Sequence, residues 1–276
     1  MSPPFRFGFS PCPNDTFAFH ALVHGLVPAP ARVQPVIADV EELNRRALAG
    51  ELPLTKLSFH ALGHVRRRYA LLTAGAALGR GCGPLVVVRP GDEGLDLGAV
   101  EVAVPGRYTT AHLLLALYLG RPPRVRPMLF SRIMPAVAAG RVAAGLIIHE
   151  GRFTYRAHGL EAVLDLGAWW EETTGLPIPL GCIALRRDLG REQALAWQEA
   201  LRASVRHALD HPGDSRAYVR AHAQEMDPAV IEQHIALYVN PFSLELGEMG
   251  LAAVEEVLRR GEEAGLLPPG GGPLLL

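Results

Sequence analysis

The segment Phe-Arg-Phe-Gly-Phe-Ser-Pro-Cys-Pro-Asn-Asp, residues 5–15, decides how the chain begins to fold. Residues 5–10 form a short apolar run rich in aromatic side chains, which predicts a β-strand ending before Pro11. The Pro-Cys-Pro-Asn-Asp sequence that follows predicts a rigid loop with good helix N-cap residues. Residues 16–23 have helical character, and Gly25 stands where a helix C-cap is expected. The chain therefore begins with a strand, a loop and a helix.

The same alternation of strands and helices continues along the chain. Further strands are predicted at residues 33–38, 54–58, 100–104 and 144–148, and helices at 41–49, 59–65, 111–119 and 133–139. Such alternation predicts an α/β fold with a mainly parallel sheet. The apolar run 84–88 is predicted as a buried strand leading out of a first unit, and 182–185 as a strand returning to it. Residues 191–266 have a helical pattern.

These elements predict a discontinuous protein of two lobes. The first lobe is expected to comprise residues 1–88 and 182–276, and the second residues 89–181. Two lobes joined by two crossing segments enclose a cleft. Ligands in open α/β sheets bind beyond the carboxyl ends of the strands, so the site is expected there.

Composition excludes several classes of protein. The chain has 27 Lys and Arg against 28 Asp and Glu, a net charge of -1, which argues against nucleic acid or an anionic membrane as a partner. Its three cysteines lack CxxC spacing, which argues against a disulfide framework or a cysteine zinc site. The N-terminal residues have no secretory pattern, and no apolar run is long enough to span a bilayer. We therefore expect a cytoplasmic protein without stable membrane insertion.

Motifs for metals and nucleotides are weak. Three segments read His-Ala-Leu-x-His, at residues 20–24, 60–64 and 207–211, but none has the glutamate of a zinc-protease motif. The glycine-rich segment 79–83 precedes a predicted strand, whereas a dinucleotide fingerprint follows one. No metal and no cofactor are predicted.

Two strand-to-helix junctions, Lys56-Leu57-Ser58 and Thr109-Thr110, are suited to an anion, because free backbone N–H groups and the helix dipole attract a carboxylate. Plain helix capping is the alternative at both. His149 follows the buried strand 144–148 and should emerge at its carboxyl end, where an imidazole can act as a general base. From the pattern alone, a structural role for His149 remains equally open.

Five segments, in order along nearly the whole chain, resemble the 1,4-dihydroxy-6-naphthoate synthases of the futalosine route to menaquinone. They are residues 8–17 (GFSPCPNDTF), 54–58 (LTKLS), 104–111 (VPGRYTTA), 145–155 (GLIIHEGRFTY) and 166–171 (LGAWWE). The resemblance implies a two-lobe type II periplasmic-binding-protein-like fold. It also implies that His149 is the proton acceptor and that Lys56, Leu57, Ser58, Thr109 and Thr110 contact the substrate. Asn14 and Asp15 match the family's first motif, either as substrate-binding residues or as helix caps.

The resemblance implies a carbon–carbon lyase that converts cyclic dehypoxanthine futalosine to 1,4-dihydroxy-6-naphthoate and releases dihydroxyacetone. The partner is then a small-molecule carboxylate, and the oligomeric state is left open. Two alternatives are kept. One is the chorismate dehydratase of the same pathway, which shares the kind of fold, and the other is a non-catalytic solute-binding protein.

Overall fold

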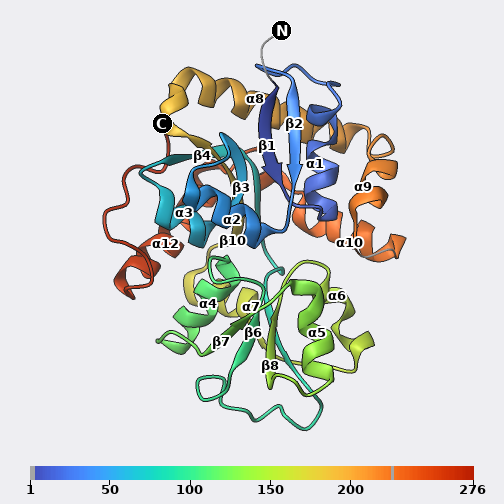
Figure 1. Cartoon of the computed structure of the whole chain (residues 1–276), viewed down its shortest axis with the longest axis vertical. Helices are drawn as coiled ribbons and strands as arrows, with labels where there is room; N and C mark the ends of the chain where they lie inside the picture. The colour runs from blue at the N-terminus through green and yellow to red at the C-terminus, as the bar shows by residue number, and fades with distance from the viewer. Residues whose placement is uncertain (1–3, 225–226) are drawn as a thin grey trace.

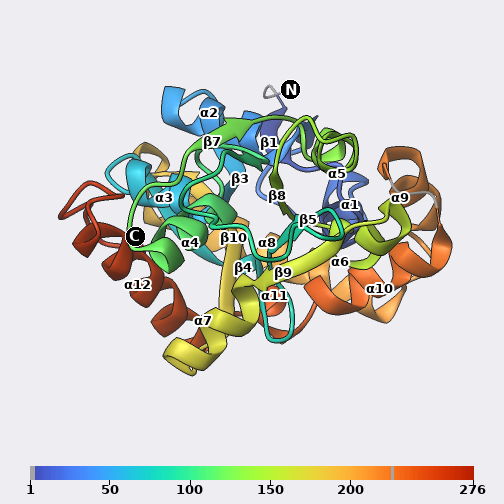
Figure 2. The same ribbon diagram turned by 90° about the horizontal axis from the view of Figure 1, so that it is seen from below.

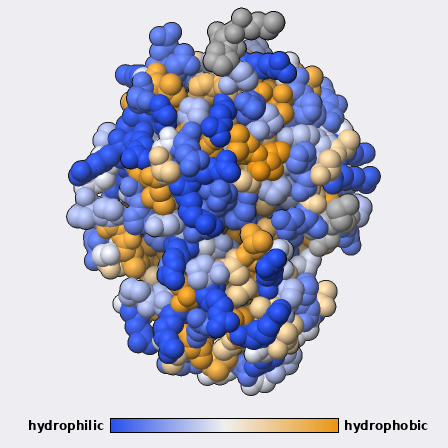
Figure 3. All heavy atoms as spheres, in the orientation of Figure 1, coloured by the Kyte–Doolittle hydropathy of each residue, from blue (hydrophilic) through white to orange (hydrophobic). Residues whose placement is uncertain are grey.

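Two β-sheets, each flanked by helices, form two lobes that lie one above the other along the longest axis of the molecule (Figure 1). The computed structural model describes residues 4–224 and 227–276. Seen from below, the second lobe lies across the strand ends of the first (Figure 2). The space-filling view shows mainly hydrophilic side chains with scattered apolar patches, and a narrower second lobe (Figure 3).

The first lobe is built on a five-stranded sheet that combines four strands from the first part of the chain with one strand that returns from the second lobe. Its strands are β1 (Phe5–Phe9), β2 (Val33–Ile37), β3 (Leu54–Ser58), β4 (Tyr69–Gly79) and β10 (Ile178–Arg186), in the order β2-β1-β3-β10-β4. β1 runs parallel to β2 and β3, whereas β10 is antiparallel to β3 and β4. The parallel strands end at one edge, where loops can gather functional side chains.

The second lobe has a similar sheet of shorter strands. They are β5 (Leu85–Val88), β6 (Val102–Val104), β7 (Val125–Pro127), β8 (Ala144–Ile147) and β9 (Glu161–Asp165), in the order β7-β6-β8-β5-β9. β6 is parallel to β7 and β8, and β5 is antiparallel to β8 and β9.

Helices follow the strands as the alternating pattern predicts. Those of the first lobe are α1 (Pro13–Val23), α2 (Val40–Ala49), α3 (Phe59–Val65), α8 (Gly190–Asp210), α9 (Arg216–His222), α10 (Pro228–Tyr238), α11 (Pro241–Leu244) and α12 (Gly247–Glu263). Those of the second lobe are α4 (Thr110–Leu119), α5 (Phe130–Ala138), α6 (Gly151–Thr154), the 3-10 turn η1 (Tyr155–His158) and α7 (Leu166–Thr174), and a further 3-10 turn, η2 (Arg187–Leu189), follows β10. α8, α9 and α10 pack against α1, and α12 packs against α3 (Figures 1 and 2).

Local sequence explains where these helices begin and end. The Asp39 carboxylate accepts a hydrogen bond from the Glu41 N–H at 2.9 Å and so caps α2, as predicted. α2 ends at Gly50, whose φ of 75° lies in the left-handed region that glycine adopts at little cost. Thr109 caps α4 in the same manner. The predicted boundaries of both helices are therefore confirmed to within a residue or so.

A continuous apolar core joins the two lobes. The largest cluster of buried side chains includes Leu57 from β3, Val86 from β5 and Leu114 from α4. α4 contacts α3, β10 and α12, all of which belong to the first lobe. This side of the interface is therefore packed like a domain interior.

The structure corrects the predicted strands near the crossings. Residues 84–88 were expected as a strand leading out of the first unit, but β5 pairs with β8 and β9 in the second sheet. β4 was not predicted, because its eleven residues are all buried and show no alternation of polar and apolar side chains. For the division into lobes we propose crossings near residues 80–84 and 175–177, where the chain passes between the sheets. In the described part of the chain, no helix is both long and apolar enough to cross a membrane.

Gly167, near the start of α7, packs directly on the first crossing. A Cβ at this position would lie 1.8 Å from the carbonyl oxygen of Cys82, and backbone cannot move as a flexible side chain can. We expect Gly167→Ala to lower the free energy of unfolding by about 3 kcal/mol, since overpacking at a rigid contact is destabilising. Urea denaturation measures this change. Gly94→Ala is the matched control because nothing lies within 4 Å of its Cβ; equal stability of the two variants would contradict the prediction.

Candidate active site

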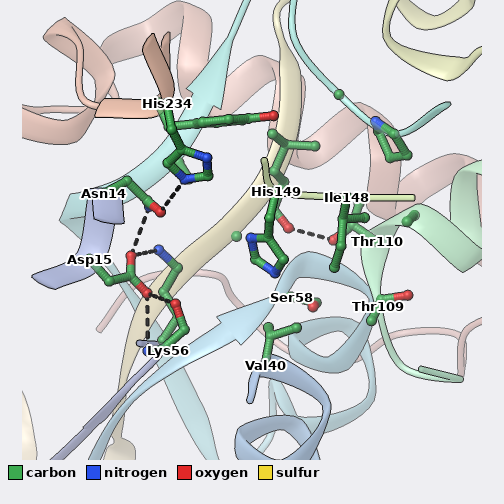
Figure 4. A pocket seen from close by; sticks show the side chains of 18 residues that line it. Asn14, Asp15, Val40, Lys56, Ser58, Thr109, Thr110, Ile148, His149 and His234 are labelled. Carbon is green, nitrogen blue, oxygen red and sulfur yellow. Dashed lines mark hydrogen bonds and ion pairs between the residues drawn. The ribbon is translucent and has the colours of Figure 1, made fainter. Parts of the chain in front are cut away.

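A cavity lies between the lobes, where loops after the parallel strands meet the C-terminal helices. Its walls come from the end of β1, the start of α1, β3, the second lobe and α10 (Figure 4). The lining residues with polar side chains are Ser10, Asn14, Asp15, Lys56, Ser58, Thr109, Thr110, His149, His234 and Tyr238. The cavity is therefore at the carboxyl ends of the strands, as predicted.

The Asp15 carboxylate is the most highly coordinated group in the cavity. It is 1% exposed and pairs with the ammonium group of Lys56. Its Oδ2 atom accepts from the Ser10 N–H at 3.1 Å and the Ser10 hydroxyl at 2.6 Å. Its Oδ1 atom also accepts from the Asn14 amide at 2.9 Å. These contacts hold β1, α1 and β3 in fixed relation, and within the described residues the carboxylate makes no capping hydrogen bond to α1.

His149 lies two residues beyond the end of β8, after Ile148. Its φ of 56° is the one positive value for a non-glycine residue in the described part of the chain. Such a conformation is uncommon for residues other than glycine, although histidine adopts it more readily than most, and it is found preferentially at functional sites. The ring lies against Phe130, with centroids 4.9 Å apart, and its Nδ1 atom is 3.3 Å from the Cys12 sulfur. The strained backbone turns the imidazole toward the first lobe.

The surroundings of His149 keep it neutral. Burial lowers its pKa to about 4, with the nearby Asp15 carboxylate acting in the opposite direction and the Lys56 ammonium reinforcing the decrease. Burial, followed by the negative charges of Glu150 and Asp15, raises the pKa of the Cys12 thiol well above its usual value. At neutral pH the pair is therefore an imidazole beside a protonated thiol. His149 therefore has a free lone pair, as a general base requires, and a thiolate nucleophile at Cys12 is disfavoured.

The two predicted anion junctions meet directly. The Thr110 hydroxyl accepts from the Phe59 N–H at 2.9 Å, across the lobes, and donates to the Leu180 carbonyl at 2.7 Å. The Ser58 N–H donates to Asn44 Oδ1 at 2.9 Å, and the Asn44 amide donates to the Ser58 hydroxyl at 3.1 Å. The Ser58 hydroxyl hydrogen stays available to a ligand, together with the first N–H groups of α4, which have no acceptor within the helix.

Glu41 ties the second lobe to this junction. Its carboxylate accepts from the N–H groups of Arg107 and Tyr108, at 2.8 and 3.1 Å, and from the Asn44 amide at 3.3 Å. Burial raises the pKa of Glu41, while these donors act to lower it. The turn that carries Thr109 and Thr110 is thus held by an acidic side chain from α2.

The structure brings together all but one of the residues proposed from the sequence. Asn14, Asp15, Lys56, Ser58, Thr109, Thr110 and His149 line the cavity. The Leu57 side chain is fully buried in the core and is not among the lining residues, because alternate side chains of β3 point to opposite faces. The roles of all these predicted residues toward the substrate stay predictions.

Sequence reasoning missed several residues of the cavity wall. His234 and Tyr238 come from α10, 220 residues or more from Asn14 in the chain, so no local pattern connects them to the site. Their spacing of four on one helix is the one signal that could have marked a shared face. Cys12 is in the first motif but carries no spacing typical of a catalytic cysteine. Within the described residues, no group of three or more His, Cys, Asp or Glu side chains is arranged to hold a metal.

Two α/β lobes around a cleft with a buried polar centre define the class of proteins with a periplasmic-binding-protein-like fold. The chain resembles the alkanesulfonate-binding protein SsuA of Xanthomonas axonopodis in fold alone, with a TM-score of 0.72 and 16% identity, covering 97% of this chain and 96% of that one. A crystal structure of an Archaeoglobus fulgidus protein is more similar, with a TM-score of 0.90 and 38% identity over 96% and 99% of the two chains. These similarities confirm the predicted fold class.

The chain belongs to the menaquinone biosynthesis family, whose model matches residues 5–263. It is 55% identical over 273 residues to the 1,4-dihydroxy-6-naphtoate synthase of Thermus thermophilus, covering 98% of each chain. It is 50% identical over 268 residues to the enzyme of the same name from Streptomyces coelicolor, covering 95% of this chain and 94% of that one.

The network around Asp15 makes a prediction about stability. Asp15→Asn should lower the free energy of unfolding by about 3–5 kcal/mol, because it leaves the buried Lys56 ammonium without its counter-charge. Glu42→Gln is the control, since it removes the carboxylate of the more exposed pair with Arg46 and should cost about 1 kcal/mol or less. Chemical denaturation of both variants gives the comparison. A change at Asp15 no larger than that at Glu42 would show that the ion pair does not hold the site together.

Proposed function

We propose that the protein is a carbon–carbon lyase, a 1,4-dihydroxy-6-naphthoate synthase of menaquinone biosynthesis. It converts cyclic dehypoxanthine futalosine to the naphthoate and releases dihydroxyacetone. The observation that carries the proposal is a neutral imidazole, His149, held by a strained backbone beside a buried carboxylate and facing hydroxyl groups across a cleft. Similarity over nearly the whole length of two synthases supports it.

His149 is proposed to remove a proton from the substrate. Because its pKa lies below neutrality, the ring is in its neutral form and has a free lone pair at neutral pH, and the Asp15 carboxylate stabilises the imidazolium that forms. General base catalysis of this kind contributes roughly 10²–10⁴-fold to a rate. The cleavage and the aromatisation of the bicycle need proton transfers but no net oxidation or reduction.

The substrate carboxylate is proposed to bind at the start of α4. The N–H groups of Thr110 and Ala111 and the positive end of the helix dipole favour an anion there. The Ser58 hydroxyl can donate from the facing junction. Lys56 is turned toward Asp15, so we propose that it serves the substrate site by holding that carboxylate in place.

The alternatives are less well supported. The fold is shared with solute-binding proteins, but relatives of 50–55% identity carry the name of an enzyme. That name also favours the synthase over the chorismate dehydratase. A cytoplasmic location and a small-molecule carboxylate as the partner remain part of the proposal.

The purified protein should convert cyclic dehypoxanthine futalosine to 1,4-dihydroxy-6-naphthoate without added metal or nucleotide. Mass spectrometry of the products measures this, with chorismate as a parallel substrate. Consumption of chorismate without any naphthoate from the first substrate would favour the chorismate dehydratase over the synthase. Tight reversible binding without turnover would indicate a solute-binding protein.

His149→Asn separates the catalytic from the structural role of this residue. Asparagine adopts positive φ more readily than most residues, so the variant should keep the backbone at 56° and melt close to the wild type. We expect kcat to fall by about 10²–10⁴-fold with little change in KM, because the general base is lost. The exposed His158→Asn, outside the cavity, is the control. Near wild-type kcat in a well-folded His149→Asn protein would exclude His149 as the base.

A further inference from the structure

His234 is a buried residue of the cavity wall to which neither the predicted mechanism nor the motifs give a role. It lies on α10 and is 1% exposed, and its ring stacks at 30° on that of His149 with centroids 6.4 Å apart (Figure 4). Its Nε2 atom is 2.9 Å from Asn14 Oδ1. Its Nδ1 atom has no hydrogen-bond partner among the described residues.

The hydrogen-bond network determines which ring nitrogen of His234 carries the proton. The Ser10 N–H and the Lys56 ammonium can only donate, so both oxygens of Asp15 act as acceptors. The Asn14 nitrogen must then donate to Asp15, which turns the Asn14 oxygen toward His234. Because that oxygen can only accept, Nε2 of His234 carries the hydrogen.

The remaining nitrogen, Nδ1, is therefore a lone-pair acceptor in the neutral ring. Burial lowers the pKa of His234 well below its usual value, and the neighbouring His149 and Lys56 act in the same direction. The ring of Tyr238 covers one side, with centroids 4.6 Å apart. An acceptor that is buried without a donor costs free energy, and a ligand that supplies the donor recovers it.

We propose that Nδ1 of His234 accepts a hydrogen bond from one of the ring hydroxyl groups of the bicyclic ligand. This proposal rests on the proposed function, because it takes the dihydroxynaphthoate skeleton as the occupant of the cavity. It makes His234 a substrate-recognition residue, oriented by Asp15 through Asn14.

The proposal also orients the ligand. A lone pair repels a carboxylate, so the acid group lies away from His234, toward the N-terminus of α4. The hydroxyl-bearing ring then lies beside both His234 and His149, whose imidazoles line the same cavity. The ring that undergoes the chemistry is thus next to the proposed base.

Two substitutions separate the two functions of the His234 ring, donation from Nε2 to Asn14 and acceptance at Nδ1. The amide nitrogen of His234→Gln can take the place of Nε2 and donate to Asn14, but this variant has no acceptor at the Nδ1 position. The amide oxygen of His234→Asn stands near the Nδ1 position and accepts, but this variant loses the contact with Asn14. The exposed His158→Gln is the control, and melting temperatures identify variants that fail to fold.

Calorimetry under anaerobic conditions tests the proposal with two ligands, 1,4-dihydroxy-6-naphthoate and naphthalene-2-carboxylate, which lacks the hydroxyls. His234→Gln should lower the affinity for the dihydroxy ligand by about 3- to 10-fold and leave the affinity for naphthalene-2-carboxylate within about 2-fold of the wild-type value. His234→Asn should recover part of the preference for the hydroxyls. The proposal would be overturned if His234→Gln kept the wild-type preference for the dihydroxy ligand, or if it lowered the affinity for both ligands equally.

The same measurements separate this inference from the proposed function. Binding of the two ligands requires no turnover. If the wild-type protein fails to make the naphthoate but prefers the dihydroxy ligand, and His234→Gln loses that preference, the lyase is refuted while the role of His234 is supported. A wild-type protein that turns over the substrate but shows no loss of preference in His234→Gln would refute the inference alone.

Discussion

The buried carboxylate of Asp15 is the interaction on which the site depends. An ionised group in a protein interior is tolerated only when it is paired and fully hydrogen-bonded, and Asp15 meets this requirement by gathering donors from three elements. The loop after β1, the first turn of α1 and the end of β3 are thereby held in one arrangement. The same carboxylate acts on His149 by charge and on His234 through Asn14. One ionised group thus sets both the geometry and the electrostatics of the cavity.

The lobes are joined by contacts that also shape the cleft. Glu41 holds the turn before α4, and Thr110 bonds to both α3 and β10. These groups come from different lobes, so the position of the helix N-terminus relative to Ser58 depends on how the lobes meet. His149 contributes from the opposite wall, where its unusual backbone aims the ring at Cys12. A preorganised site of this kind favours catalysis, because the groups need not reorganise during the reaction.

The fold alone does not distinguish an enzyme from a binding protein. Similarity to a sulfonate-binding protein at 16% identity shows only that two lobes around a cleft are a common solution for enclosing a small molecule. What points to chemistry is the combination of side chains in the cleft. Burial keeps His149 and His234 neutral, so both offer lone pairs at neutral pH. Such groups accept protons and hydrogen bonds, whereas α4 and Ser58 on the other side offer donors.

The sequence by itself determined the alternation of elements and most of the site. Caps such as Asp39 and Gly50 act over a few residues, and the strand ends that carry Lys56, Ser58 and His149 follow from short apolar runs. Only the tertiary structure decided that β5 joins the second sheet, that the Leu57 side chain turns into the core, and that His234 completes the cavity wall. Each of these depends on pairing between distant segments. Local propensity does not encode such pairing, because it arises from burying several elements against one another at once.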